Sequence, residues 1–196
     1  MGCAGGSITI GGHDVKEFTC DSLLKNMSMV FQNVYLFHDT IENNIKFGCP
    51  DATHEQVVEA AKKACCHDFI SALPQGYDTV IGEGGSTLSG GEKQRISIAR
   101  AMLKDAPIIL LDEATASVDP ENEVHLQQAI SALVKNKTLI VIAHRLSTIR
   151  DADQILVVDN GKIVEKGVHA ELIQQKGIYQ KFWNIRQKAR NWKLAQ

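Results

Sequence analysis

The chain has 196 residues, of which 44% are hydrophobic and 22% are charged, and its formal net charge is −2. These proportions are ordinary for one compact globular domain with a real core. The small net charge excludes the global basic field on which many nucleic-acid-binding proteins depend. A basic stretch from Lys176 to Lys193 is the local exception, and we interpret it as the solvated face of an amphipathic helix.

Neither a membrane-spanning helix nor a secretory signal is predicted. The longest apolar runs are far shorter than the roughly 18 residues that a spanning helix needs, and the residues from Met1 to Ser7 are small and uncharged. The five cysteines are odd in number and show no C-x-x-C spacing, which fits reduced thiols. We therefore expect a cytoplasmic location, with a partner holding the chain at a membrane surface if it works there.

In chain order, the first predicted elements are two short strands and a helical region. Residues 7–11 alternate in polarity like a strand, and residues 27–31 are an apolar run that ends before Gln32. Helical signals follow from 39 to 80. Thr53 and Gln56 have the spacing of a capping box, and Pro74 with Gly76 closes a second short helix over about 67–73.

From residue 86 onward, helices and strands alternate. We predict helices over about 90–104 and 120–134, and strands over 107–111 and 138–143. Both apolar runs are unbroken, as in parallel strands that are buried on both faces, and a helix between such strands forms a βαβ unit. Residues 154–167 are predicted to form a hairpin, because Asn160-Gly161 suits a type I′ turn. Two amphipathic helices, about 169–175 and 177–193, end the chain.

Polar residues follow three of the predicted strands. Gln32 follows 27–31, Asp112 and Glu113 follow 107–111, and His144 follows 138–143. Ligands of parallel α/β sheets bind beyond the carboxyl ends of the strands. A polar residue after one strand is usually a loop residue, but three such positions on neighbouring strands favour one site.

Asp112 and Glu113 form the sharpest of these patterns. An acidic pair after an apolar strand is how a nucleotide hydrolase presents a carboxylate to Mg²⁺, and the second carboxylate is then free to polarise a water. Taken alone, the pattern fits equally well a second interpretation, in which Asp112 only caps the next helix.

The segment Leu88-Ser89-Gly90-Gly91-Glu92 also has two interpretations. Ser89 and Glu92 have capping-box spacing, which is a structural role. Two glycines in the first turn cost roughly 1 kcal/mol each relative to alanine, so a purely structural cap would not favour them. They leave bare N–H groups at the positive end of a helix, where a phosphate can approach. We therefore predict an anion site.

Several segments resemble the nucleotide-binding domain of ATP-binding cassette (ABC) proteins, in the same order and with the same spacing. LSGGEKQR (88–95) resembles the signature motif, IILLDEATASVD (108–119) the Walker B strand with the D-loop, and AHRLST (143–148) the switch-histidine segment. VFQ (30–32) is similar to the Q-loop, and GEGG (82–85) to the segment before the signature. The resemblance extends from about residue 7 to residue 182.

The resemblance implies an α/β fold with a P-loop-NTPase-like, mostly parallel sheet. The core would comprise residues 7–38 and 91–182, the helical subdomain about 39–90, and a basic helical tail 183–196, with a β-hairpin and helices towards the C-terminus.

It also implies ATP and Mg²⁺ as cofactors and a role for each matching residue. Asp112 would hold Mg²⁺ through water and Gln32 would sense it. Glu113 would be the general base and His144 would contact the γ-phosphate. The signature residues Ser89, Gly90, Gly91 and Glu92 would bind the nucleotide held by the opposite subunit. Asp119 would lie at the interface between the two subunits.

Two further segments resemble those of type I exporters rather than importers. LFHDTIENNI (36–45) is similar to the surface that receives coupling helices, and GVHAELIQQKGIY (167–179) to the exporter C-terminus. The implied partners are a second nucleotide-binding domain, arranged head to tail, and the transmembrane domain of a transporter, with no nucleic acid. The implied function is ATP hydrolysis coupled to transmembrane transport at the cytoplasmic side of the cell membrane.

The family's phosphate-binding loop, G-x-x-x-x-G-K-[ST], has no match in the sequence. That loop supplies backbone donors and a lysine to the phosphates. Without it about five charge-assisted hydrogen bonds are lost, each of about 1.5–3 kcal/mol. Their sum exceeds the whole binding free energy of a sub-millimolar ligand, which is roughly 5–6 kcal/mol. We expect the chain alone not to hold MgATP.

Two hypotheses on function stay open. The chain is either part of an exporter cassette that hydrolyses ATP, or a truncated cassette that lends its signature motif to an intact partner. A DNA-repair cassette is disfavoured, because neither a coiled-coil insertion nor a basic face is present.

Overall fold

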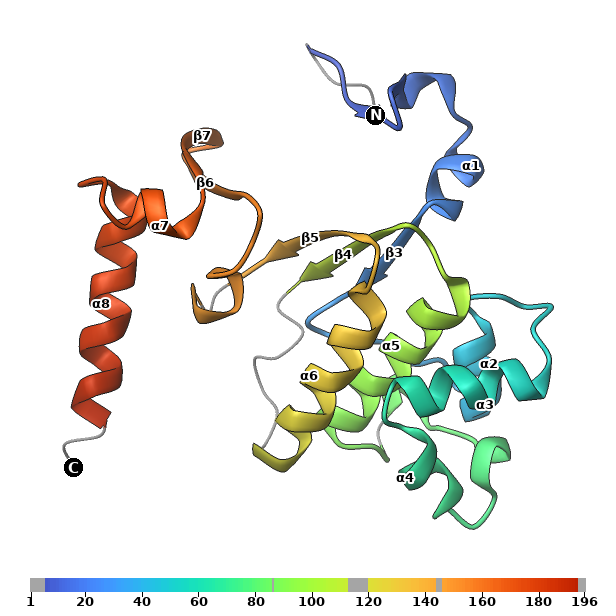
Figure 1. Ribbon diagram of the computed structural model, residues 1–196. Coiled ribbons are helices and arrows are strands. Elements are labelled where there is room, and N and C mark those ends of the chain that lie inside the picture. The colour runs from blue at the N-terminus through green and yellow to red at the C-terminus, as the bar shows by residue number, and fades with distance from the viewer. Residues whose placement is uncertain (1–5, 86, 113–119, 144–145, 194–196) are drawn as a thin grey trace. The chain divides into compact units, whose positions relative to one another are not determined.

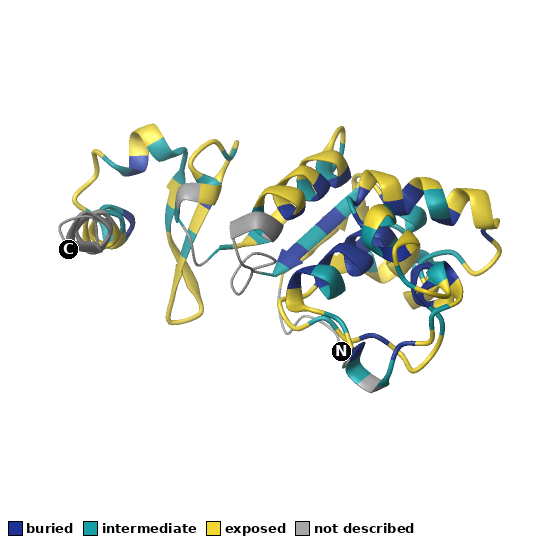
Figure 2. Ribbon diagram, turned by 90° about the horizontal axis from the view of Figure 1, so that it is seen from below, coloured by how far each residue is buried: buried dark blue, intermediate teal, exposed yellow. Residues whose placement is uncertain are grey.

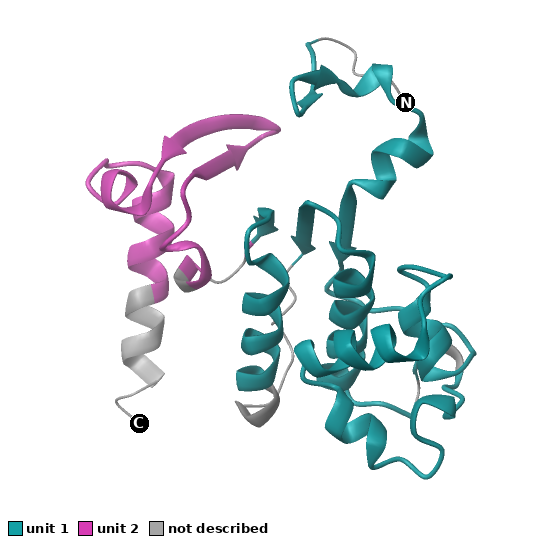
Figure 3. Ribbon diagram, turned by 45° about the vertical axis from the view of Figure 1, so that its right-hand side comes forward, with its two compact units in different colours: residues 1–142 teal, residues 143–196 magenta. Residues whose placement is uncertain are grey.

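The computed structural model describes residues 6–85, 87–112, 120–143 and 146–193. The chain forms two compact units, residues 1–142 and residues 143–196 (Figure 3), which are described separately below.

A three-stranded parallel sheet is the centre of unit 1 (Figure 1). Its strands are β3 (Met27–Val30), β4 (Ile108–Asp112) and β5 (Thr138–Ile142), in the order β3-β4-β5. In the register, Met29 faces Leu110, which in turn faces Ile140. The predicted βαβ unit is therefore confirmed. Before β3 lie a small antiparallel pair, β1 (Thr9–Ile10) with β2 (His13–Asp14), a 3₁₀ turn (Val15–Glu17) and α1 (Cys20–Lys25).

Two long helices cover one face of this sheet, as Figures 1 and 2 show. They are α5 (Gly90–Lys104) and α6 (Pro120–Val134), with bounds as predicted. α5 ends where Asp105 adopts a left-handed conformation with φ 53°, which stops the helical hydrogen-bond pattern. The fully buried side chains between these helices and the sheet include Val30, Ile96, Ile98, Ile109, Leu126 and Leu133.

Short helices pack on the side of α5 and complete unit 1. They are α2 (Ile41–Lys46), α3 (His54–Lys63) and α4 (His67–Ser71), with 3₁₀ turns at Gly76–Asp78 and Glu83–Gly85. The predicted capping box of α3 is confirmed, since the Gln56 N–H donates to Thr53 Oγ1 over 3.4 Å and the Thr53 N–H to Gln56 Oε1 over 2.8 Å. α4 ends at Ser71, slightly earlier than predicted.

Glu42 ties α2 to α3. Its carboxylate lies 2.8 Å from Lys46 Nζ and 2.7 Å from His54 Nδ1. Although burial alone raises its pKa, hydrogen bonds from Lys46 and His54 lower the pKa of the Glu42 carboxyl below its ordinary value of 4.5. Glu42 therefore stabilises the contact between the two helices in its ionised form.

The prediction that β5 is buried on both faces is wrong for unit 1. Ile140 is 55% exposed and Ile142 is 59% exposed, and Leu139 is exposed as well. The physical reason is that β5 is an edge strand and that, within the described residues of unit 1, the long helices cover only one face of the sheet. β4, in the centre, alternates between buried and half-buried residues.

Unit 2 consists of a hairpin and two helices. The predicted hairpin is confirmed: β6 (Ile155–Asp159) pairs with β7 (Lys162–Gly167), and the turn residues Asn160 and Gly161 have φ values of 49° and 75°, as a type I′ turn requires. A 3₁₀ turn (Leu146–Ile149) precedes it, and α7 (His169–Leu172) and α8 (Ile178–Lys193) follow. α7 ends three residues earlier than predicted. A small core of Ile155, Leu172 and Tyr179 holds this unit together.

Candidate nucleotide site

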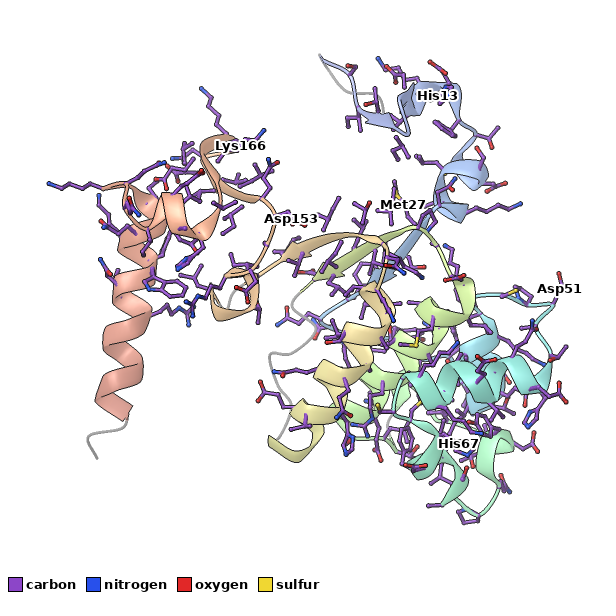
Figure 4. The ribbon with its side chains drawn as sticks, in the orientation of Figure 1. His13, Met27, Asp51, His67, Asp153 and Lys166 are labelled. Carbon is purple, nitrogen blue, oxygen red and sulfur yellow. The ribbon has the colours of Figure 1, made fainter. Side chains whose placement is uncertain are left out.

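The carboxyl edge of the sheet gathers two of the predicted site residues. Met27 marks the opposite edge, where β3 begins (Figure 4). Val30, at the other end of β3, is paired with Leu111 of β4. Gln32, which is exposed, follows β3, and Asp112, which is half-buried, ends the neighbouring strand β4. The neighbouring strand β5 ends beside Asp112 at Ile142. Two predicted residues, Glu113 and His144, lie outside the described residues.

Asp112 suits a magnesium ion that arrives with its nucleotide. Mg²⁺ in such sites keeps several waters and takes one or two carboxylates together with phosphate oxygens. Among the residues that the structure describes, Asp112 forms no ion pair, and no cluster of three or more His, Cys, Asp or Glu residues could hold a metal on its own. The residues present fit the ion as a companion of the phosphates rather than as a resident metal.

The alternative role of Asp112 as a helix cap stays a prediction, because the residues that link β4 to α6 lie outside the described part of the chain. Asp112 is the last residue of β4, and α6 is described from Pro120 onward. Among the described residues, the Asp112 carboxylate has no hydrogen-bond or ion-pair partner, so a ligand can approach it at the sheet edge.

The N-terminus of α5 has the predicted capping box. The Glu92 N–H donates to Ser89 Oγ over 3.3 Å, and the Ser89 N–H donates to Glu92 Oε2 over 2.8 Å. Gly90 is exposed and Gly91 is buried, and neither N–H has a hydrogen-bond partner among the described residues. The helix dipole adds partial positive charge at this end of a 15-residue helix. The arrangement can therefore receive an anion. Asp119, the remaining predicted residue, lies outside the described part.

Gln94 is a site residue that the sequence analysis missed. Its side chain is only 4% exposed, and its Nε2 donates to the carbonyl oxygen of Phe31 over 3.2 Å. Phe31 directly precedes Gln32, so this bond ties the signature helix to the end of β3. The signal in the sequence was a polar residue on the buried stripe of α5, four residues before Ile98.

Arg95 makes a second connection from the signature helix. It is 5% exposed, and its guanidinium lies 5.3 Å from the ring centroid of Phe69 in the α4 region, within the range of a cation–π contact. α5 is thus held on one side by the sheet edge and on another by the short helices, which fixes the position of its N-terminus.

Comparisons with known proteins agree with this geometry. The family profile described as ABC transporter matches residues 2–116, which is more than half of the chain. An ATP-dependent lipid A-core flippase of Vibrio cholerae is 52% identical over 181 residues, covering 92% of this chain and 31% of that protein. A Staphylococcus aureus protein named for multidrug export ATP-binding/permease activity is 52% identical over 180 residues, with the same coverage of 92% and 31%.

A solved structure of a bacterial Atm1-family ABC exporter with ATP bound superimposes with a TM-score of 0.86 at 45% identity. The match covers 93% of this chain and 32% of the exporter chain. The chain thus spans about a third of the length of the relatives that it matches. It belongs to the ABC transporter family and has the nucleotide-binding fold of that family's exporters.

Proposed function

We propose that the chain is part of the ATP-hydrolysing domain of an exporter and helps to drive transmembrane transport. The single observation that carries this proposal is the pairing of two features in one unit: Asp112 at the end of the central strand, and a glycine-bearing helix N-terminus capped by Ser89. A carboxylate for a metal and a donor site for a phosphate are what a nucleotide hydrolase has to present.

Each residue then has a chemical task. Asp112 would hold Mg²⁺ through water, Gln32 would sense the ion from the adjacent strand end, and Glu113 would accept the proton of the attacking water. A base of this kind contributes typically 10²–10⁴-fold in rate. His144 donates to the terminal phosphate. When bound, Mg²⁺ supplies electrophilic stabilisation of phosphate charge.

The N-terminus of α5 serves a different nucleotide. In the proposed head-to-tail arrangement, Ser89, Gly90 and Gly91 donate to the phosphates held by a second nucleotide-binding domain, with Glu92 fixing Ser89 and Asp119 lying at the interface. The transmembrane domain is the other proposed partner. Among the described residues no helix has the length and hydropathy to cross a membrane. The proposed work with an exporter's transmembrane domain places this domain on the cytoplasmic face.

A chimeric exporter tests the proposal. The 181-residue stretch of the Vibrio cholerae flippase that aligns with this chain is replaced by the corresponding residues of this chain, so that the flippase supplies the phosphate loop and the membrane domain. We expect ATP hydrolysis by this flippase chimera, and a loss of about 10²–10⁴-fold on Glu113→Gln with an ATP-stabilised dimer retained. A chimera that binds ATP and dimerises but hydrolyses no faster than its Glu113→Gln variant would refute the proposal.

A second candidate function is supply of the signature motif in trans to an intact domain. The specific observation in its favour is that the capped N-terminus of α5, with Gly90 and Gly91 in its first turn, can receive an anion held by another domain. In a mixture of this chain with the intact nucleotide-binding domain of the flippase, this candidate predicts faster hydrolysis that Ser89→Asp removes and Glu113→Gln leaves unchanged. Micromolar MgATP binding by the 196-residue chain alone, measured by calorimetry, would contradict it.

A further inference from the structure

The helix α8 carries two apolar stripes, and the structure gives a partner within unit 2 to only one of them. Tyr179 and Trp183, one turn apart, face the small core of unit 2: Tyr179 is 2% exposed, and Trp183 packs against that core. Phe182 and Ile185, also one turn apart, are 57% and 62% exposed. By the helical repeat, the second stripe lies about 100° around the helix from the first. One stripe is sufficient to join a helix to its own domain, so the second is available to another surface.

The beginning of α8 is fixed to the hairpin by a carboxylate. Glu165 in β7 accepts hydrogen bonds from the backbone N–H groups of Ile178 and of Tyr179, the latter over 3.1 Å. His169 Nδ1 lies 2.8 Å from the Tyr179 hydroxyl oxygen, and the His169 ring centroid lies 4.4 Å from that of Trp183. These contacts hold the helix by its first stripe, and its later turns extend beyond the hairpin and α7 (Figure 1). Unit 2 therefore presents the second stripe on a preorganised helix, which lowers the entropic cost of binding.

The second stripe has the spacing of a coiled-coil seam. In the sequence, its apolar residues follow one another in alternating steps of four and three residues: Ile178, Phe182, Ile185, Ala189 and Trp192. All of these positions lie on α8, and we refer to them as the α8 seam. Such steps are typical of the a and d positions at which one helix packs against another. The seam is narrower than the apolar face of an ordinary amphipathic helix, which favours a second helix over a lipid surface as its occupant.

The positions that flank the α8 seam are basic. With Phe182 as position a, the e and g positions from residue 181 onward are Lys181, Arg186, Lys188 and Lys193. Lys181 and Arg186 are exposed, and among the residues that the structure describes neither forms an ion pair. The sequence contains no Asp or Glu after Glu171, so α8 supplies no carboxylate to balance these cations.

This charge pattern disfavours a second copy of the chain as the occupant. In a parallel pair of helices a g residue meets an e residue of the other helix, which would oppose Lys181 to Arg186 of the second copy. In an antiparallel pair, g meets g and e meets e, so cations would again oppose cations. Like charges at these positions select against a partner, and opposite charges select for it. The flanks of α8 therefore require acidic residues at the e and g positions of the helix that binds it.

We propose that the α8 seam docks a helix of a different polypeptide whose e and g positions carry Asp or Glu. Phe182 and Ile185 pack against the apolar a and d positions of that helix, while Lys181 and Arg186 pair with carboxylates on its flanks. The apolar seam contributes affinity, and the flanking charges determine the choice of partner. The inference concerns unit 2 alone and goes beyond ATP hydrolysis, on which it does not depend.

Two synthetic peptides of the same composition test the charge requirement without any nucleotide. Both have about three heptads with Leu at a and d; one carries Glu at e and g, and the other carries the same glutamates at b, c and f. Each is fluorescently labelled, kept below the concentration at which it self-associates, and titrated with the 196-residue chain. We expect the e/g peptide to bind at least about tenfold more tightly, with a preference that shrinks as the salt rises to about 1 M. Equal binding of the two peptides, or binding of neither, would overturn the proposal.

A charge exchange on the chain locates the contact. The double variant Lys181→Glu/Arg186→Glu should bind the e/g peptide at least about tenfold more weakly and should instead bind a peptide with Lys at e and g. Lys166→Glu/Lys176→Glu changes the net charge equally at two exposed positions of unit 2 outside α8 and should leave binding unchanged. Equal weakening by both double variants would reduce the attraction to net charge and refute the location. The gain of the Lys peptide shows that the exchanged variant is folded.

The other possible occupants give different results. A dimer of the chain in sedimentation velocity that Ile185→Asp dissociates would assign the seam to a second copy and overturn the proposal. So would binding to vesicles of phosphatidylglycerol and phosphatidylcholine that the e/g peptide does not compete with, because the occupant would then be lipid. A monomeric chain from which the e/g peptide displaces any bound vesicle supports the proposal. None of these measurements involves ATP, so hydrolysis by the flippase chimera stays a separate result.

Discussion

Two helices of this protein begin with the same capping chemistry, and only one of them is proposed to receive a phosphate. In the box of α3 the two hydrogen bonds measure 3.4 and 2.8 Å, and in that of α5 they measure 3.3 and 2.8 Å. Removing an N-cap hydroxyl costs about 0.5–2 kcal/mol, typically ~1 kcal/mol. Thr53→Ala and Ser89→Ala should therefore destabilise unit 1 by similar amounts, and Thr53→Ala is a matched control for the loss of a cap.

Aspartate substitutions separate the cap from the anion site. Aspartate caps as well as serine, and its charge gains about 0.3–1 kcal/mol from the helix dipole. The Ser89→Asp and Thr53→Asp variants should both unfold at a urea concentration at least as high as that of the unaltered chain. A carboxylate at position 89, however, occupies the space of a phosphate and repels it, so only Ser89→Asp should abolish ATP-dependent dimerisation of the flippase chimera.

The assay is urea unfolding of the 196-residue chain, followed by circular dichroism, together with dimerisation of the flippase chimera in MgATP. With a slope of about 1–3 kcal/mol per molar urea, a loss of ~1 kcal/mol moves the midpoint by about 0.3–1 M. If Ser89→Asp is stable and the chimera still dimerises in ATP, the N-terminus of α5 is a structural cap alone and the reasoning fails.

Three further outcomes are expected. Gln94→Ala leaves the Phe31 carbonyl without its partner and should cost about 1–3 kcal/mol in urea unfolding; no change would mean that water replaces the amide. Ile109→Ala, in the buried centre of the sheet, should cost about 2–5 kcal/mol, whereas Ile140→Ala on the exposed face should cost about 0.5 kcal/mol or less, and equal losses would contradict the burial. Since the pKa of Glu42 is lowered on folding, its contribution is present above about pH 4.5 and is lost as the pH falls through the lowered value; Glu42→Gln should flatten acid destabilisation measured by urea midpoints, and an unchanged pH profile would exclude this role.

Local patterns were sufficient to predict most of the elements. The bounds of α5 and α6 and both capping boxes followed from periodicity, caps and turn residues. So did the hairpin turn at Asn160-Gly161, because its φ values depend on those two residues. Such features are determined within a few residues, where the sequence carries the whole cause. The length of the short helix α7 was overestimated, because the end of a four-residue helix depends on weak signals.

Side chains that join distant elements could not be predicted in this way. Gln94 bonds to a carbonyl 63 residues earlier in the chain, and Arg100 to one 56 residues earlier. Neither hydrogen bond can be predicted from the spacing of residues in the sequence, because each depends on how α5 packs against β3 and α2. What the sequence does reveal is a polar side chain on a buried stripe, and a buried polar group needs a partner. That rule predicts a tether without identifying its other end.

The exposure of β5 shows how composition and coverage can disagree. The run Thr138–Ile142 has the composition of a strand with apolar cover on both faces, yet Ile140 and Ile142 stay more than half exposed in unit 1. Their positions alternate with Leu139 and Val141, so the residues of both faces are apolar although the long helices cover only one. The apolar face that includes Ile140 pairs with Leu110 and Met29 in register, which makes the surface continuous across all three strands. In unit 1 taken alone, β5 has a hydrogen-bonded neighbour on one side only among the described strands, whereas β4 is paired on both sides, so the amides of β5 should exchange with solvent before those of β4.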